Sequence, residues 1–272
     1  MINLKDIKFS YGENTVLQNI SMTLKEGRIY GLLGENGVGK TTLLTLMCGL
    51  KKPDKGQIST DGWDPYDRDP DFLSQQYYLG DDLAAPNMKA SDFAANYGSF
   101  RPDFSMDTFA SIMKEFETDI TQKMNCMSYG QLKKTHVAFA LACRTKYLFM
   151  DEPTNGLDIP SKSQFRKAVM KYTREDSTIV ISTHQVRDLE NIIDPIIILD
   201  SKEVLLNAGL EEIAARLFFD YSNTPRPDAL YCEMIPGGSI QVCMNTDSQE
   251  SKVNIEALFN TVHRHKSIIK NL

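Results

Sequence analysis

The chain has 272 residues, of which 42% are hydrophobic and 24% are charged, as is ordinary for a globular protein with a buried core. At roughly 150 residues per domain, this length indicates one large domain, alone or with a small appendage. The 30 Lys and Arg residues against 36 Asp and Glu residues give a net charge of −6. This balance argues against nonspecific binding to nucleic acids or anionic membranes and leaves room only for a local basic patch.

No segment of the sequence is expected to cross a membrane. The longest unbroken apolar run, Val137 to Cys143, has seven residues, whereas a membrane-spanning helix needs ~20. The N-terminus alternates polar and apolar residues and lacks the apolar block of a signal peptide. The five cysteines form no C-x-x-C pair, which is typical of free thiols in a reducing cytosol.

The first predicted elements along the chain are strands. Residues 2–9 and 16–24 largely alternate polar and apolar side chains, which predicts two strands joined by a turn at 11–14. Residues 28–33 form a short apolar run that we expect to be a third strand. Residues 41–50 then have the spacing and the closing glycine of a helix.

Two later runs, 146–150 and 178–182, are short, apolar and followed by polar residues. That pattern is typical of buried parallel strands whose C-terminal ends carry a site. Before the first of these runs, residues from about 70 to 145 have helical spacing and little strand character. We therefore expect a helical insert there.

The pattern changes in the C-terminal part of the chain. Residues 196–206 predict a last strand pair, and residues 211–219 predict a helix. A turn-rich break at 222–227 follows. Beyond it we expect two short strands around Pro236-Gly237-Gly238 and a final helix over 253–266.

A phosphate loop is the strongest motif in the sequence. The run Gly34-Glu35-Asn36-Gly37-Val38-Gly39-Lys40-Thr41 fits the Walker A pattern G-x-x-x-x-G-K-[ST], between a predicted strand and a predicted helix. Its glycines let backbone N–H groups turn toward phosphate oxygens, and the helix N-terminus adds its positive dipole end. We expect Lys40 to neutralise the β- and γ-phosphates and the Thr41 hydroxyl to ligate Mg²⁺.

Two acids follow the apolar run Leu148-Phe149-Met150. Asp151 at the strand tip is expected to hold Mg²⁺ through water, and Glu152 to orient or deprotonate the water that attacks the γ-phosphate. Taken alone, the two carboxylates would indicate a solvated turn. Together with the phosphate loop, they favour hydrolysis of a magnesium nucleotide.

With Asp151-Glu152-Pro153-Thr154-Asn155-Gly156-Leu157-Asp158 in view, the chain resembles the ATP-binding-cassette (ABC) ATPases, the nucleotide-binding subunits of ABC transporters. The resemblance covers residues 1–208 and implies an α/β P-loop NTPase cassette, with a mixed sheet core, an antiparallel N-terminal β subdomain and a helical subdomain at about 70–145. Residues 209–272 would be a small α+β appendage, with dimerisation and regulation as open alternatives.

Further positions match the family. Met127-Ser128-Tyr129-Gly130-Gln131 stands where the family has its signature, usually Leu-Ser-Gly-Gly-Gln. His184 stands at the switch histidine, and Tyr11 at the aromatic residue that stacks on adenine. The resemblance also places Val16 and Thr42 at the nucleotide.

The family forms head-to-tail dimers, here with the same or a different cassette, in which ATP lies between the phosphate loop of one subunit and the signature of the other. Ser128, Gly130 and Gln131 would therefore meet the partner's nucleotide. Ser128 and Gly130 precede an apolar helix, so they would present a helix N-terminus to the γ-phosphate. A plain N-cap is the alternative for Ser128.

Two departures from the family pattern stand out. Tyr129 replaces the first glycine of the signature. The family's Q-loop glutamine, which touches Mg²⁺ and faces the membrane subunit, is absent from the matching stretch Tyr78-Leu79-Gly80-Asp81-Asp82. Asp81 or Asp82 is expected either to supply an oxygen to Mg²⁺ or to be a loop acid without that contact.

The aromatic-rich part of the insert, residues 93–104, resembles ATPases of small bacterial export and antibiotic-response systems. Phe93, Tyr97, Phe100 and Phe104 sit at helical spacing, so we expect mostly core residues, with some lining the groove for the permease's coupling helix.

These features predict an ATPase that binds ATP and Mg²⁺, acts at the inner face of the cell membrane and powers export through separate permease subunits. No nucleic-acid partner is expected. The alternative is a non-transport or regulatory ABC protein that uses ATP binding as a switch.

Overall fold

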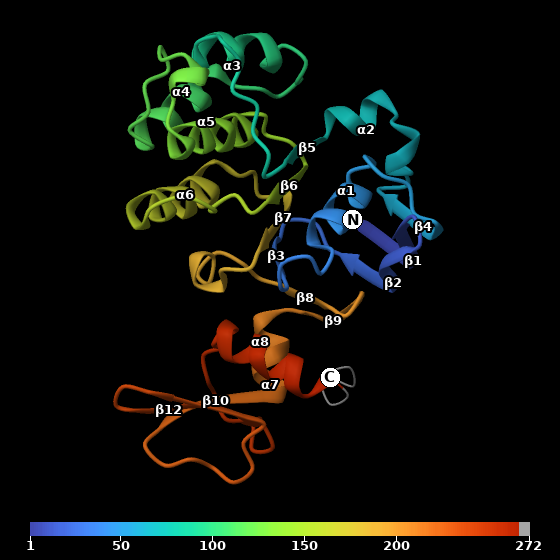
Figure 1. Ribbon diagram of the computed structural model, residues 1–272, viewed down its shortest axis with the longest axis vertical. Helices are drawn as coiled ribbons and strands as arrows, with labels where there is room; N and C mark the ends of the chain where they lie inside the picture. Colours follow the sequence, from blue (N-terminus) through green and yellow to red (C-terminus); the bar gives the residue numbers. More distant parts are fainter. Residues whose placement is uncertain (267–272) are drawn as a thin grey trace.

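The computed structural model describes residues 1–266, which form three sheets with helices packed around them (Figure 1). The main sheet has six strands in the order β5-β6-β7-β3-β8-β9. Its neighbours run parallel except for β9, which is antiparallel to β8. In chain order the strands are β3 (Ile29–Leu33), β5 (Gln76–Leu79), β6 (Tyr147–Asp151), β7 (Thr178–Thr183), β8 (Ile196–Asp200) and β9 (Glu203–Ala208). The predicted central strands and the last strand pair are confirmed.

A second sheet, in the order β2-β1-β4, is antiparallel and lies beside the main sheet (Figure 1). It consists of β1 (Ile2–Tyr11), β2 (Asn14–Leu24) and β4 (Lys55–Thr60). The first two strands and their turn were predicted from the alternating pattern, and β4 was not. Helix α1 (Lys40–Met47) begins at the end of the phosphate loop, and a 3-10 turn (Pro65–Asp67) follows β4.

The helical subdomain lies above the main sheet in Figure 1, except for its first helix, which lies beside α1. Its helices are α2 (Pro70–Ser74), α3 (Ala90–Gly98), α4 (Met106–Glu115) and α5 (Tyr129–Ala142), with a 3-10 turn at Met124–Cys126. Helix α6 (Ile159–Tyr172) and a 3-10 turn (Val186–Asp188) complete the core. The expectation of little strand character was wrong in one place, because Gln76–Leu79 forms β5 and pairs with β6 at the sheet edge.

The aromatic residues of the insert do not share one environment. Phe93 is buried against Phe139, whereas Tyr97 is 49% exposed and Phe100 is 81% exposed. Helix α3 ends at Gly98, so Phe100 and Phe104 lie outside it although their spacing in the sequence is helical. Phe104 is partly buried and packs against Phe139. Core positions are therefore found for Phe93 and partly for Phe104, whereas Tyr97 is exposed and Phe100 lines a surface cavity, as was expected for some of the four.

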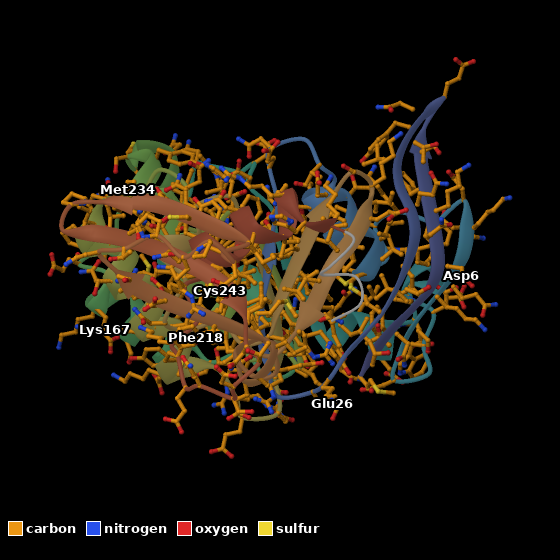
Figure 2. All side chains as sticks on the ribbon, turned by 90° about the horizontal axis from the view of Figure 1, so that it is seen from below. Asp6, Glu26, Lys167, Phe218, Met234 and Cys243 are labelled. Carbon is orange, nitrogen blue, oxygen red and sulfur yellow. The ribbon has the colours of Figure 1, made fainter. Side chains whose placement is uncertain are left out.

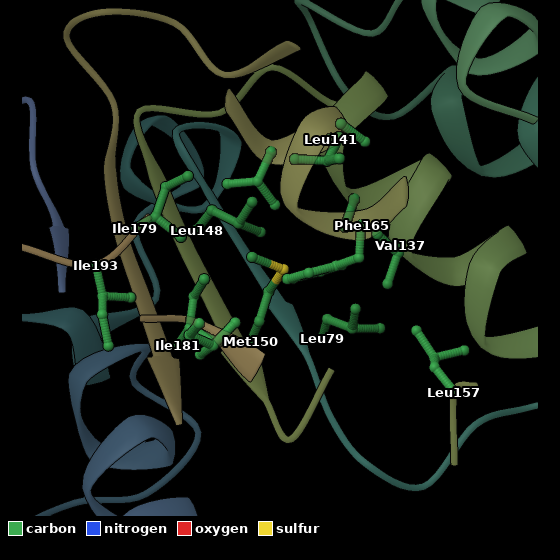
Figure 3. Packing of buried hydrophobic residues seen from close by; sticks show 14 of the residues in the cluster. Leu79, Val137, Leu141, Leu148, Met150, Leu157, Phe165, Ile179, Ile181 and Ile193 are labelled. Carbon is green, nitrogen blue, oxygen red and sulfur yellow. The ribbon is translucent and has the colours of Figure 1, made fainter. Parts of the chain in front are cut away.

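Alternate residues of the central strands face two different apolar clusters. Leu148 and Met150 belong to a larger cluster that includes the helical subdomain and the C-terminal part. Tyr147 and Phe149, their neighbours on β6, belong to a cluster shared with the N-terminal sheet and α1. Figure 3 shows side chains of β6, β7, α5 and α6 in the larger cluster, among them Met150, Ile181, Val137 and Phe165.

The C-terminal appendage has a three-stranded antiparallel sheet in the order β10-β12-β11. Its elements are α7 (Leu210–Arg216), β10 (Leu217–Ser222), β11 (Tyr231–Ile235), β12 (Gly238–Met244) and α8 (Ile255–Arg264). Figure 2 shows the sheet from below, with Phe218, Met234 and Cys243 on it. The helix predicted over 211–219 ends earlier, at Arg216, because the apolar and aromatic run that follows pairs with β12. The final helix, predicted over 253–266, is confirmed with the shorter bounds Ile255–Arg264.

Candidate nucleotide-binding site

The phosphate loop connects β3 to α1, and two of its glycines have left-handed backbone angles. The φ angle is 80° at Gly37 and 112° at Gly39, which residues with a Cβ rarely adopt. Lys40 is 6% exposed, and its Nζ donates hydrogen bonds to the backbone oxygens of Gly34, at 2.8 Å, and Glu35, at 3.2 Å. The ammonium group is thus held inside the loop, where phosphate oxygens would bind.

Two hydroxyl groups fix the acid at the tip of β6. Asp151 is buried, and its Oδ2 accepts a hydrogen bond from Thr41 Oγ1 at 2.5 Å. Its Oδ1 accepts one from Ser182 Oγ. Strands β6, β7 and β3 are neighbours in the sheet, so the motifs that follow them meet at one edge. Ser182 was not among the predicted site residues, although it stands two residues before His184.

Glu152 has a φ angle of 46°, in the left-handed region, and its N–H donates to Ser182 Oγ at 3.0 Å. This strained conformation places the carboxylate between two groups. Oε1 lies 3.4 Å from Lys40 Nζ, and Oε2 lies 3.0 Å from His184 Nδ1. Oε1 is buried, yet no group within residues 1–266 donates a hydrogen bond to it. Since buried acceptors are normally satisfied, this oxygen is available to a molecule that enters the site.

Most of the residues predicted to bind the nucleotide and its metal ion line one cavity of about 530 Å³. They are Tyr11, Val16, Asn36, Gly37, Gly39, Lys40, Thr41, Thr42, Asp81, Asp151, Glu152 and His184. Asn155 also lines this cavity and was not predicted, although it lies within the motif that follows β6. Gly34, Glu35 and Val38 are not on the wall. The first two hold Lys40 through their carbonyls, and Val38 packs against the cluster beneath the N-terminal sheet.

Tyr11, expected to stack on adenine, is a half-exposed residue of the cavity wall. Its hydroxyl lies 3.3 Å from Thr42 Oγ1, and Phe9 packs edge-on against its ring. The ammonium group of Lys51 lies 4.9 Å from the ring centroid. A base that stacks on Tyr11 would therefore share the ring with a cation.

The signature residues lie apart from this cavity. Ser128 caps α5, because its Oγ accepts a hydrogen bond from the Gln131 N–H at 3.3 Å and Gln131 Oε1 accepts one from the Ser128 N–H at 2.9 Å. Gly130 lies in the first turn of the same helix. Neither these two residues nor Gln131 line the cavity. One chain thus carries two separate parts, a phosphate-loop cavity and a capped helix start.

Of the two acids in place of the Q-loop glutamine, only Asp81 lines the cavity. Its Oδ1 accepts a hydrogen bond from Lys133 Nζ at 2.8 Å, and Asp82 is exposed. Tyr78 lies nearby. Burial raises the pKa of the Tyr78 phenol, and the Asp151 carboxylate adds to the rise, so the phenol stays protonated.

Known proteins are similar to this chain over most of its length. The profile of the ABC transporter family matches residues 17–155. The ABC transporter ATP-binding protein NatA of Bacillus subtilis is 30% identical over 206 residues, which is 72% of this chain and 83% of NatA. The lantibiotic transport ATP-binding protein SrtF of Streptococcus pyogenes is 29% identical over 200 residues, 71% of this chain and 84% of SrtF. The chain belongs to the ABC transporter family.

The fold of this ABC subunit agrees with solved cassettes. A dimeric bacterial ABC transporter cassette aligns with a TM-score of 0.68 and 26% identity over 77% of this chain and 99% of the cassette. The ATP-binding subunit of another ABC transporter aligns with a TM-score of 0.70 and 22% identity over 78% and 91%. The chain is therefore an ABC ATP-binding subunit with the P-loop cassette fold, an ATPase that powers transport. Within residues 1–266, every helix is too short or too polar to span a bilayer.

Proposed function

We propose that this ABC subunit hydrolyses MgATP in a head-to-tail pair of cassettes and thereby drives export through separate membrane permease chains. The observation that carries the proposal is the buried Glu152 Oε1, which lacks a donor within residues 1–266 and lies beside Lys40. A water in line with the γ-phosphate would donate to this oxygen. His184, at the other carboxylate oxygen, would hold Glu152 in that orientation.

The residues present fit a magnesium ion. The Thr41 hydroxyl and the Asp151 carboxylate are hard oxygen donors, and they already lie 2.5 Å apart on the cavity wall. We propose that Thr41 binds Mg²⁺ directly and Asp151 through water. Asp81 has one carboxylate oxygen engaged by Lys133, and its other oxygen is a further candidate ligand. Bound Mg²⁺ would offset the charge of the β- and γ-phosphates.

The separation of the signature from the cavity supports the head-to-tail arrangement. Ser128 and Gly130 open a helix of 14 residues, whose N-terminus carries a partial positive charge. Neither residue lines the cavity of its own chain. A second cassette, turned head to tail, would bring this partial charge to the γ-phosphate and complete the site.

A second cavity, of about 520 Å³, supports a membrane partner. It lies between α2, β5 and the end of α3, and its walls include the exposed side chains of Leu50 and Phe100. Arg101 is fixed there by hydrogen bonds from its guanidinium group to the backbone oxygens of Leu73 and Gln76. An exposed apolar groove with a rigid wall suits an amphipathic segment of a permease.

The similarity to SrtF and the aromatic insert support export, as in a lantibiotic-transport or antibiotic-response system, over import. With a permease as partner, the subunit would act on the inner face of the cell membrane. Residues 1–208 would form the ATPase domain, with the helical subdomain at about 70–145, and residues 209–272 a dimerisation or regulatory appendage.

Steady-state ATP hydrolysis, measured against protein concentration, tests the dimer and the chemistry together. We expect turnover per chain to rise with concentration and to vanish in Glu152→Gln. Bound ATP without turnover at any concentration would favour a switch, or a requirement for a different cassette or the permease. Affinity purification from detergent-solubilised membranes tests the transport role, which fails without a membrane-embedded partner.

A further inference from the structure

Lys133 is a fully buried lysine between two unusual residues of this chain. Its Nζ donates to Asp81 Oδ1 at 2.8 Å and lies 5.8 Å from the ring centroid of Tyr129. The exposure of its side chain is 0%, although the Asp81 side chain is 45% exposed. A buried ammonium group is costly unless it is paired. The ion pair with Asp81 and the nearby Tyr129 ring therefore stabilise the buried ammonium group.

Tyr129 in turn packs on the segment that follows β6. Gly156 has a φ angle of 76°, and a Cβ at this position would lie 2.6 Å from Tyr129 Cε1. That distance is far below a normal carbon contact, so the ring lies directly on the glycine backbone. The aromatic ring that replaces the first glycine of the signature thus touches the loop just after Glu152.

The fold explains why these four residues meet. Tyr129 and Lys133 are four residues apart on α5, so their side chains share one face of the helix. Asp81 follows β5, and Gly156 follows β6, its parallel neighbour. Figure 3 shows Leu79 of β5, Val137 of α5 and Leu157, the residue after Gly156 in the sequence, in the apolar cluster that joins these segments.

We propose that Lys133 is a positioning residue that links the nucleotide cavity to the signature helix and the loop at Gly156. The link runs from Asp81 on the cavity wall, through Lys133, to the Tyr129 ring and Gly156. This proposal rests on the proposed function and adds its regulation. It makes the two departures from the family pattern, Asp81 and Tyr129, parts of one structural unit.

Electrostatics give the link its direction. Asp81 is a carboxylate in the cavity that receives a triphosphate, so MgATP changes the field around it directly. Lys133 is buried and paired with Asp81. A movement of the Asp81 carboxylate therefore changes the electrostatic attraction that holds the Lys133 ammonium group beside Tyr129. The start of α5, with Ser128 as its cap, and the loop at Gly156 then respond together.

Amide hydrogen exchange tests the link without the need for turnover. At a protein concentration where the chain is monomeric, MgATP should slow exchange at 128–131 and 155–158 by about threefold or more. Lys133→Met should abolish this response while ATP binding, measured with a fluorescent ATP analogue, changes by less than about twofold. Lys134→Met is the matched control, since Lys134 Nζ donates to the Phe116 carbonyl instead. It should keep the response.

A pair of variants separates positioning from stability. Asp81→Asn leaves Lys133 unpaired and should lower the melting temperature. The double variant Asp81→Asn with Lys133→Met removes both charges, so it should melt closer to the wild type yet still lack the exchange response. Recovery of the response together with stability would mean that the pair is only structural and would overturn the proposal.

A double-mutant cycle tests the other end of the link. Gly156→Ala should reduce kcat strongly in the wild type, where the new methyl group meets the Tyr129 ring, and less in a Tyr129→Gly background. Equal reductions would overturn the contact. If the wild type hydrolyses no ATP but the exchange response depends on Lys133, the proposed function fails and the link stands. If hydrolysis is normal and the exchange response is identical in Lys133→Met and Lys134→Met, the proposed link is wrong and the proposed function stands.

Discussion

Glu152 and His184 lie 3.0 Å apart, between Oε2 of the carboxylate and Nδ1 of the imidazole. They follow β6 and β7, which are adjacent parallel strands, so the sheet itself sets their spacing. The other oxygen of Glu152 faces Lys40 and has no donor within residues 1–266. The carboxylate is thus paired with His184 through one oxygen, while the other oxygen forms an ion pair with Lys40 at 3.4 Å and can still accept a hydrogen bond.

Replacing Glu152 with glutamine should lower kcat by a factor of about 10²–10³, because the amide cannot accept the proton of the attacking water. Binding of ATP should persist, since Lys40 and the loop amides are unchanged. Phosphate release and equilibrium binding of a fluorescent ATP analogue measure the two effects. Glu175→Gln, at an exposed position, is the control. Equal turnover in both variants would falsify the role assigned to Glu152.

His184→Ala should reduce kcat about tenfold to a hundredfold with little effect on the KM for ATP, because the histidine acts on the orientation of Glu152. In the Glu152→Gln background the same change should have almost no further effect, since the two residues act as a unit. Single-turnover measurements on the four proteins of this cycle decide the matter. Independent, multiplicative losses would show that His184 acts elsewhere.

Phe100→Asp should disrupt association with the permease, because it places a charge on the wall of the apolar groove. Co-purification of membrane chains with the tagged subunit measures the effect, and we expect at least a tenfold loss. Met170→Asp changes a similarly exposed apolar residue on α6, away from the groove, and should retain the partner. Retention in both variants would place the docking surface elsewhere.

Acidification should destabilise the protein through His136. Burial lowers the pKa of this imidazole, which is 6% exposed and whose Nε2 lies 2.7 Å from the Ala84 carbonyl oxygen. The unfolded chain therefore binds a proton at a pH where the folded chain does not, and stability falls as the pH drops below about 6.5, the ordinary value for histidine.

Thermal melts between pH 7.5 and 5.5 test this linkage. Each kcal/mol lost should lower Tm by about 2–4 °C in a protein of this size. His136→Gln should melt with a smaller dependence on pH over that range, whatever its stability at pH 7.5. A dependence as steep as that of the wild type would assign the linkage to another group.

Most of the nucleotide cavity could be predicted from the sequence, because its motifs are local. Each follows a short buried strand, and adjacent parallel strands bring Gly34, Asp151 and Ser182 to one edge. The position of Lys133 could not be predicted, because it depends on a contact between segments that are far apart in the sequence. Nothing in the helical pattern of α5 distinguishes it from an ordinary surface lysine, and its partner Asp81 comes from a distant segment.

The ends of two helices were predicted wrongly, because the local helical pattern competes there with contacts to distant parts of the chain. Helical spacing continues past Gly98 to Phe104, but the chain leaves the helix at Gly98, whose Cα hydrogens face the Phe104 ring with no room for a Cβ. Residues 217–219 could extend α7 by pattern alone. Pairing with β12 decides for a strand, and that pairing depends on a segment the local pattern does not contain.

Successive side chains along β6 belong alternately to two separate apolar clusters. Met150 and Phe149 are neighbours in sequence, yet a cavity at Met150 loosens the layer shared by the helical subdomain and the appendage, and a cavity at Phe149 loosens the layer beneath the N-terminal sheet. Substitutions can therefore accumulate on one face of the sheet with little effect on the other.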